Sequence, residues 1–311
     1  MGKPVLALAG GVGGAKLALG LARVLPPEQL VIVVNTGDDE EFHGLHVSPD
    51  LDTVMYTLAG LANPETGWGI AGDTFYTLEL LERLGAPTWF RLGDRDFATH
   101  IRRTELLRRG WTLSEVTGEL CRRLGVEHTV APMSDDPVRT AVLTNEGELP
   151  FQEYFVRRRC EPRLRGLRFQ GVEQARPSPG FDAALQEAGA LVICPSNPIV
   201  SIDPILALQG VRERIAALAC PRVAVSPIVG GEAVRGPAAK MLRELGEGSS
   251  SLSIARRYLG LCDALIIDQS DRHLAGEIEA LGMAVEVTPT LMTSDEDKVA
   301  LARKVCELTG S

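Results

Sequence analysis

Several short segments of the chain carry residue types that bind phosphate, cations or polar ligands. The first is the run Gly10-Gly11-Val12-Gly13-Gly14, which stands between a short apolar stretch and an amphipathic one. Backbone amides of such a turn can approach an anion, and the N-terminus of a following helix adds its positive pole. The spacing is neither the dinucleotide G-x-G-x-x-G nor a P-loop. A phosphate or another polar ligand is therefore expected here, with a plain tight turn as the alternative.

Carboxylates cluster in two segments that follow the second apolar run. Asp38 lies in N-T-G-D-D-E-E, and Asp50 and Asp52 lie in S-P-D-L-D-T. Carboxylate oxygens suit a hard cation such as Mg²⁺, which is the usual partner of diphosphate chemistry. We therefore expect Asp38 and Asp52 to bind Mg²⁺. A helix N-cap is the alternative role for Asp50 or Asp52, and Glu40 and Glu41 are expected in a solvated acidic loop.

Arg91 opens the segment R-L-G-D-R-D, and His100 follows in the next helical stretch. The planar guanidinium fork of an arginine matches phosphate or carboxylate geometry, and a neighbouring aspartate can hold the fork in place. Arg91 is therefore expected to contact a ligand, with a surface ion pair to Asp94 or Asp96 as the alternative. His100 is expected to be a packed helix residue rather than a catalytic base.

Two proline-containing loops directly follow apolar runs later in the chain. Ser196 and Asn197 lie in P-S-N-P, and Ser226 and Gly230 lie in S-P-I-V-G-G. At equivalent ends of neighbouring strands, such loops would present hydroxyl, amide and backbone donors to one ligand. A nucleotide pocket is expected at these loops, and ordinary turn chemistry is the alternative.

The elements that must position these segments form a regular alternation. Short runs rich in valine and isoleucine predict strands at 5–9, 30–35, 190–194, 222–226, 264–268 and 284–287. Amphipathic stretches predict helices at 15–25, 98–109, 113–124, 237–245, 270–281 and 295–308. This alternation is typical of an α/β protein with a Rossmann-like parallel sheet and helices on both faces.

Residues 133–179 interrupt the alternation. They contain frequent proline and glycine, an alternating apolar stretch at 138–144 and a cluster of arginines. We therefore expect a smaller inserted β-rich subdomain at 133–179, with 1–132 and 180–311 forming the Rossmann-like core.

The composition limits the classes of function. The 311 residues are 45% hydrophobic, enough for a large core, and the net charge of −9 disfavours nucleic acid as the main partner. The six cysteines lack zinc-ligand spacing and are expected to be reduced thiols. No leader-like segment and no apolar stretch of about 18 residues is present, so a cytoplasmic protein without a membrane partner is expected.

Taken together, the motifs resemble a known enzyme family. From Gly10 to Ser294 the chain carries, in order, G-G-x-G-G, V-V-N-T-G-D-D, S-P-D-L-D-T, L-G-D-R-D-x-A-T-H, P-M-S-D-D-P, P-S-N-P, S-P-I-V-G and L-M-T-S. This series resembles the family that contains the 2-phospho-L-lactate transferases of deazaflavin-coenzyme biosynthesis. The resemblance implies a magnesium-dependent transferase that forms a homodimer. The acceptor would be 7,8-didemethyl-8-hydroxy-5-deazariboflavin, the donor a guanosine-diphosphate-activated 2-phospho acid, and the products GMP and a precursor of coenzyme F-420.

The resemblance also implies roles for the residues quoted above. Deazaflavin would be bound by Asp52, Arg91, Gly11 and Gly13. The nucleotide would be bound by Gly10, Gly14, Ser196, Asn197, Ser226 and Gly230. The metal-binding carboxylates would be Asp38 with Asp50 or Asp52. The family often has G-G-T-G-T-P-K where this chain has G-G-V-G-G-A-K, so whether the donor carries lactate, enolpyruvate or glycerate stays open.

In the expected reaction, the terminal hydroxyl of the deazaflavin side chain attacks the phosphorus that carries the acid. Asp50 or Asp52 is the expected catalytic base. The alternative is a non-catalytic, nucleotide-sugar-binding regulatory protein of the same fold, which would need neither Asp52 nor Arg91. A nicotinamide oxidoreductase is disfavoured, because Asn35 stands where the ribose-binding acid would be.

Overall fold

The structure, a computed structural model that describes residues 2–311, is built on a seven-stranded parallel sheet. The strand order is β14-β13-β10-β9-β1-β2-β5, and every neighbouring pair is parallel. The strands are β1 (Val5–Ala9), β2 (Leu30–Val34), β5 (Thr129–Pro132), β9 (Ala190–Ile193), β10 (Arg222–Val225), β13 (Ala264–Ile267) and β14 (Ala284–Val287). Each predicted strand is present. β5 was not predicted, because T-V-A-P is a weak apolar run that ends in proline.

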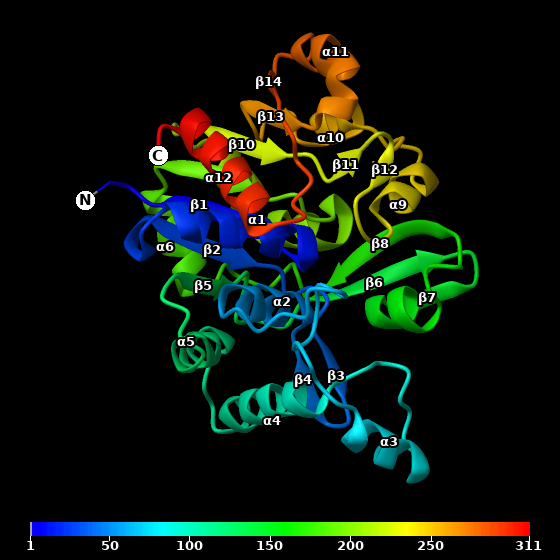
Figure 1. Ribbon diagram of the computed structural model, residues 1–311. Coiled ribbons are helices and arrows are strands. Elements are labelled where there is room, and N and C mark those ends of the chain that lie inside the picture. The colour runs from blue at the N-terminus through cyan, green and yellow to red at the C-terminus, as the bar shows by residue number, and fades with distance from the viewer. Residues whose placement is uncertain (1) are drawn as a thin grey trace.

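Helices cover the sheet on both faces (Figure 1). Their bounds are α1 (Gly11–Val24), α2 (Pro49–Leu58), α3 (Tyr76–Arg83), α4 (Asp94–Arg108), α5 (Leu113–Arg123), α6 (Pro179–Glu187), α7 (Asp203–Leu206), α8 (Val211–Ala216), α9 (Ala238–Glu244), α10 (Ser251–Arg257), α11 (Ala275–Glu279) and α12 (Asp295–Thr309). The helices predicted at 15–25 and 98–109 begin four residues earlier, at Gly11 and Asp94. The predicted helix at 270–281 is divided into a 3-10 turn, η4 (Gln269–Leu274), and α11. The predicted Rossmann-like α/β fold class is confirmed.

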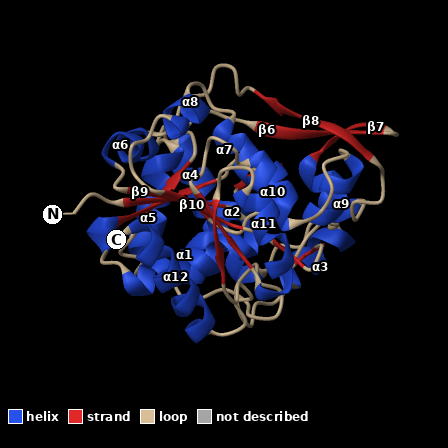
Figure 2. Cartoon of the chain, turned by 90° about the horizontal axis from the view of Figure 1, so that it is seen from above, coloured by secondary structure: helices blue, strands red, loops and turns tan. Residues whose placement is uncertain are grey.

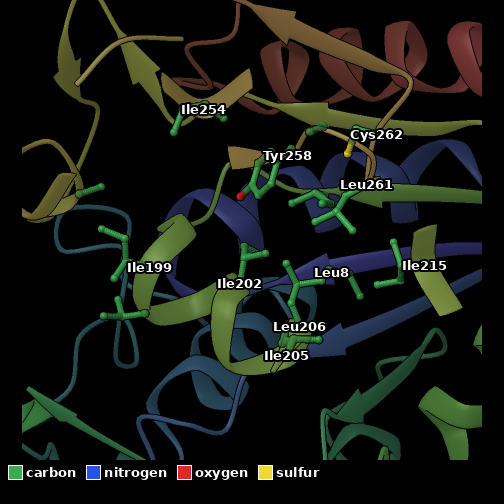
Figure 3. Close-up of a cluster of buried hydrophobic side chains, with 14 of the residues drawn as sticks. Leu8, Ile199, Ile202, Ile205, Leu206, Ile215, Ile254, Tyr258, Leu261 and Cys262 are labelled. Carbon is green, nitrogen blue, oxygen red and sulfur yellow. The ribbon is translucent and has the colours of Figure 1, made fainter. Parts of the chain in front are cut away.

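Each face of the sheet has its own hydrophobic core. Along β1, Ala7 joins one buried cluster, whereas Leu6 and Leu8 join the other, because successive strand side chains point to opposite faces. α1, α2, α5 and α12 pack on the first cluster, and α6 to α11 pack on the second. Figure 3 shows Leu8 in the second cluster beside Leu206 of α7. A sheet buried on both sides leaves its strand ends as the places where polar groups can gather.

An arm extends from this body, at the bottom of Figure 1. It consists of α3, α4 and the hairpin of β3 (Glu40–Phe42) and β4 (Leu45–Val47). Glu40 and Glu41 were expected in a loop, but they lie in β3 and pair with β4. The ring of Phe42 stacks on Phe90 at 4.0 Å between centroids, and this aromatic contact holds the hairpin against the segment before α4.

A second, antiparallel sheet occupies the region 133–179, at one edge of the molecule in Figure 2. Its strands are β6 (Arg139–Thr144), β7 (Gly147–Pro150) and β8 (Leu164–Gln170), in the order β7-β6-β8. A π-helical turn, η2 (Glu153–Arg157), follows β7. Val142, Tyr154 and Leu164 belong to the same buried cluster as the central sheet, so the division into core and subdomain stays a prediction.

Two further short strands, β11 (Ile228–Val229) and β12 (Glu232–Ala233), pair as a hairpin, and the turns η1 (Pro27–Gln29) and η3 (Pro198–Ile202) complete the chain. Within residues 2–311, all six cysteines are unpaired, as expected. No helix in this described part of the chain is long and apolar enough to cross a membrane.

Candidate functional site

A large pocket opens at the carboxyl ends of the central strands. Its volume is about 890 Å³, and it is lined by the segments that follow β1, β2, β9, β10 and β14. It gathers most of the residues that the sequence analysis selected: Gly10, Gly11, Gly13, Asp38, Asp50, Asp52, Arg91, Ser196, Asn197 and Ser226. Gly14 and Gly230 are not among its lining residues. Residues from distant parts of the sequence thus meet at the edge where open α/β sheets bind ligands.

The glycine run forms the first turn of α1 and packs against its neighbours. The amide of Gly10 donates to Ser196 Oγ at 3.0 Å, and the amide of Gly11 donates to Asp50 Oδ1 at 2.7 Å. A Cβ at Gly13 would meet the carbonyl of Pro195, and one at Gly14 would meet Ser196. The glycines therefore allow close packing and hold Asp50 at the start of α1, where a carboxylate is favoured.

Two buried carboxylates lie together behind this turn. Asn35, fully buried at the end of β2, donates through Nδ2 to Asp38 Oδ1 and to Asp50 Oδ2, each at 3.0 Å. Ser201 Oγ also donates to Asp50 Oδ2, at 3.2 Å. Burial raises the pKa of Asp50 to about 6. Burial, and then the charge of Asp50, raise the pKa of Asp38. Such a pair favours a proton or a cation between its members.

Asp52 has a different environment, although it lies only two residues after Asp50. The guanidinium of Arg103, only 1% exposed, donates to both oxygens of Asp52, with Nη1 3.1 Å from Oδ2. Arg103 Nη1 also lies 3.3 Å from Nδ1 of His100, which is buried as expected for a packed residue. Arg103 was not predicted from the sequence, because it lies next to the exposed Arg102 in a helix whose residues are mostly polar.

Arg91 lies at the rim of the pocket, next to an aromatic wall. Its guanidinium carbon stands 4.2 Å from the centre of the Phe75 ring. Within residues 2–311 it forms no ion pair with Asp94, which instead accepts hydrogen bonds from Thr74, Tyr76 and Thr77. The wall itself, which the sequence analysis did not identify, consists of Trp68, Trp89, Phe90 and Phe155.

The loops after β9 and β10 also line the pocket; they are neutral, and we call them the loop side. Asn197 Oδ1 accepts from the amide of Ile199, which fixes the loop after β9. Ser226 Oγ lies 3.0 Å from Ser251 Oγ, and Ser251 in turn donates to Asp271 at 2.9 Å. Asp271 also accepts from the amide of Gly230 at 3.2 Å, so Gly230 supports the loop from behind the pocket.

Two basic side chains complete this loop side. Lys16 Nζ donates to the carbonyl of Met292 at 2.6 Å, and Arg235 donates to the carbonyls of Glu65 and Thr66. Burial, followed by the charge of Arg235, lowers the pKa of Lys16. Both side chains line the pocket, where they can neutralise an anionic ligand.

The fold and this pocket define a Rossmann-like α/β protein with its large pocket at the carboxyl edge of the sheet, where such folds bind ligands. The sequence model of the 2-phospho-L-lactate transferase CofD family matches residues 5–303. The chain belongs to this family of transferases, as its motifs indicated.

Curated relatives are similar over nearly their whole length. The chain is 45% identical to the phosphoenolpyruvate transferase of Streptomyces griseus over 310 residues, which cover 98% of each chain. It is 42% identical to the 2-phospho-L-lactate transferase of Methanothermobacter thermautotrophicus over 299 residues, which cover 96% of each. Among solved structures, a member of the UPF0052 family from Bacillus halodurans has the same fold, with a TM-score of 0.64, 14% identity, and 98% and 99% of the two chains covered.

Proposed function

We propose that this protein transfers a 2-phospho acid from a guanosine-diphosphate-activated donor to 7,8-didemethyl-8-hydroxy-5-deazariboflavin, releasing GMP, in coenzyme F-420 biosynthesis. The membership of the CofD family supports a transferase of this kind. The observation that carries the proposal is that one pocket is lined both by aromatic side chains and by neutral polar loops with two cations. These two sets of residues match one planar substrate and one diphosphate substrate.

The aromatic wall suits the ring system of the acceptor. A deazaflavin is a planar, conjugated molecule, and Trp68, Trp89, Phe90 and Phe155 offer flat apolar surfaces on one side of the pocket. Arg91 stands at the same rim, where its fork can donate to the polar edge of the ring or to the side-chain hydroxyls. The acceptor hydroxyl would then point inward, toward Asp52.

The loop side suits the donor. Ser196, Asn197 and Ser226 present hydroxyl and amide groups that can bind a guanosine. Lys16 and Arg235 lie on the same side and would neutralise the diphosphate. The relatives include both phosphoenolpyruvate and 2-phospho-L-lactate transferases, so either acid is a candidate for the donor.

Magnesium, which we propose as the cofactor, fits Asp38 and Asp50 better than Asp52. Asp38 and Asp50 both accept a hydrogen bond from Asn35, and the charge of Asp50 raises the pKa of Asp38. A cation between the two carboxylates would offset this repulsion. Both oxygens of Asp52 already accept from Arg103. Within residues 2–311, no three His, Cys, Asp or Glu side chains form a complete metal cage. Mg²⁺ is often held by only one or two carboxylates together with water and substrate phosphates.

In the proposed reaction, the acceptor hydroxyl forms a bond to the phosphorus that carries the acid, and the bond from this phosphorus to GMP breaks. The hydroxyl proton passes to a carboxylate of the chain. Asp52 lines the pocket and is held by Arg103, so we assign it the role of orienting the hydroxyl, with Asp50 as the other carboxylate in reach of the pocket. When bound, magnesium supplies charge neutralisation at the diphosphate. Such transfer depends mainly on position and charge.

The test is direct. The purified protein is incubated with the deazaflavin, Mg²⁺ and, in separate reactions, the guanylated derivatives of lactate, enolpyruvate and glycerate, and the products are weighed by mass spectrometry. One of these donors should give a deazaflavin phosphodiester together with an equal amount of GMP. Failure of all three, with a folded protein, would contradict the proposed donor or acceptor.

The same preparation should be examined by light scattering, because a homodimer is also part of the proposal.

A further inference from the structure

A buried charged network lies directly behind the part of the pocket that contains Asp52. Asp52 and Tyr56 lie one turn apart on α2, and Asp96, His100 and Arg103 recur at helical spacing on α4. The two helices therefore present these side chains to each other. Asp52, Tyr56, Asp96 and His100 line the pocket, whereas Arg103 is not among the lining residues. Arg103 can influence a ligand only through the residues that it holds.

The chemistry of the side chains fixes the direction of each hydrogen bond. An arginine has donors only, so Asp52 and Nδ1 of His100 both accept from Arg103. The other ring nitrogen of His100, Nε2, lies 3.2 Å from Asp96 Oδ1. Tyr56 donates to the same oxygen of Asp96 at 2.7 Å. The orientations of Asp52 and Asp96 are thus set by Arg103 and Tyr56, whereas Nε2 of His100 makes no hydrogen bond within residues 2–311.

Stability alone does not account for this arrangement. Replacing a buried ion pair by apolar residues of similar volume is often neutral or stabilising, because two charges must be taken out of water. Burial by itself would lower the pKa of Arg103, but the charge and hydrogen bonds of Asp52 raise it. The pair therefore stays charged, and its two parallel hydrogen bonds leave the Asp52 carboxylate a single orientation at the pocket wall.

We propose that Arg103 is a positioning residue for the acceptor: its guanidinium, supported by His100, holds the Asp52 carboxylate in the one orientation that receives the acceptor hydroxyl. This inference rests on the proposed function, because it takes the acceptor to be the ligand of Asp52. It also explains why two aspartates separated by one residue differ in role. Within residues 2–311, Asp50 accepts no hydrogen bond from an arginine and shares Asn35 with Asp38, whereas Asp52 accepts two hydrogen bonds from Arg103.

The test compares Arg103→Lys with the matched control Arg102→Lys. Lysine keeps the charge but cannot make two parallel hydrogen bonds. Arg102 is the adjacent, exposed residue of α4 and forms an ion pair with Glu105. Deazaflavin and GDP affinities, kcat and the thermal unfolding midpoint are measured for the parent and both variants. Arg103→Lys should weaken deazaflavin binding at least about tenfold and lower kcat, with GDP affinity unchanged. Arg102→Lys should match the parent.

A second comparison removes the ambiguity of a poorly folded variant. The double variant Asp52→Asn with Arg103→Gln removes both charges of the ion pair together, so neither member of the pair is left charged without the other. If Arg103 acts through Asp52, this double variant should bind deazaflavin as the Asp52→Asn single variant does. A double variant that binds deazaflavin at least about tenfold more weakly than the single variant would show that Arg103 acts by itself, and would overturn the inference.

The outcomes separate this inference from the proposed function. A parent protein that binds no deazaflavin contradicts the proposed function, and the role of Arg103 fails with it. A parent that binds deazaflavin, together with an Arg103→Lys variant that binds it equally well, overturns the role of Arg103 alone. A loss of thermal stability without any change in deazaflavin affinity or kcat would likewise mean that Arg103 is purely structural.

Discussion

The two sides of the pocket hold their polar side chains by different interactions. On the loop side, Ser196 and Ser226 are neutral and are held by backbone amides and other hydroxyls. On the acidic side, Asp38 and Asp50 are buried carboxylates joined by an amide, and Asp52 is paired with Arg103. Neutral turns cost little to bury when they are hydrogen-bonded, whereas buried charges need counterions. The acidic side should therefore respond more strongly to substitution, to pH and to metal removal.

The largest effect is expected from removal of the metal. EDTA should abolish transfer, and added Mg²⁺ should restore it, because Asp38 and Asp50 would otherwise face the diphosphate as an uncompensated pair. Zinc, which prefers nitrogen and sulfur ligands, should restore activity poorly. The measurement is the rate of GMP release. Full activity in the presence of chelator would contradict the proposed role of magnesium in the transfer.

Asp52→Asn should lower turnover by at least about a hundredfold, which corresponds to roughly 3 kcal/mol of transition-state stabilisation. The amide keeps the shape of the side chain, but it offers Arg103 one acceptor in place of two. Steady-state kinetics with a circular-dichroism check of folding provide the measurement. Near-normal turnover in a folded variant would mean that Asp52 has no part in the reaction.

Arg91→Lys should weaken deazaflavin binding by about ten- to a hundredfold, or roughly 1.5 to 3 kcal/mol, the range for a hydrogen bond to a charged group. Lysine retains the charge but loses the fork and the flat contact with Phe75. Separate titrations with deazaflavin and with GDP test this. Unchanged affinity for both ligands would mean that Arg91 is a surface residue with no role in binding. A loss of affinity confined to GDP would mean that the two substrates are assigned to the wrong sides of the pocket.

The pH dependence of magnesium activation should locate the metal on the acidic side. Burial raises the pKa of Asp50 to about 6, so the carboxylate form prevails above that pH and the protonated form below it. Because a metal ligand must be deprotonated and burial also raises the pKa of Asp38, the apparent Mg²⁺ affinity should fall by about tenfold or more per unit below about pH 6 and level off only where Asp38 is deprotonated as well. Magnesium titrations at several pH values measure this. An affinity independent of pH between about 5 and 7 would exclude Asp50 as a ligand.

The smallest effect is expected on the loop side. Ser196→Ala removes the acceptor of the Gly10 amide and should cost about 1 to 3 kcal/mol of unfolding free energy. GDP affinity should fall by at most about tenfold, with deazaflavin affinity unchanged, because the loop is still fixed by Asn197. Denaturant unfolding and GDP titration measure the two effects. A loss of deazaflavin affinity larger than the loss of GDP affinity would contradict the division of the pocket.

The same comparison explains which parts of the molecule could be predicted. The strands of the central sheet are continuous apolar runs, and a motif at the end of a parallel strand necessarily reaches the shared edge. Ser196, Ser226 and residues 10–13 of the glycine run were therefore found from the sequence and do line the pocket, whereas Gly14 does not. The predicted strand ends positioned them without any knowledge of side-chain contacts.

The acidic and aromatic side depends on contacts between elements that no local pattern encodes. Arg103 is buried because α4 packs against β4 and α5 and its side chain reaches Asp52 of α2, whereas its neighbour Arg102 has the same type and the opposite exposure. Trp68 and Phe155 come from segments far apart in the chain, and the intervening fold brings them to one wall. The roles proposed for Asp38, Asp50 and Asp52 stay predictions, but their contacts now distinguish them.

The central claim is that the two sides of this pocket bind two different substrates at the same time. The most direct measurement is a calorimetric titration of the parent protein with deazaflavin, in the presence of Mg²⁺, first without GDP and then at saturating GDP. The account predicts one deazaflavin bound per chain in both titrations, with an affinity that changes by less than about fivefold. Loss of deazaflavin binding at saturating GDP, as expected for two ligands that compete for one place, would contradict it.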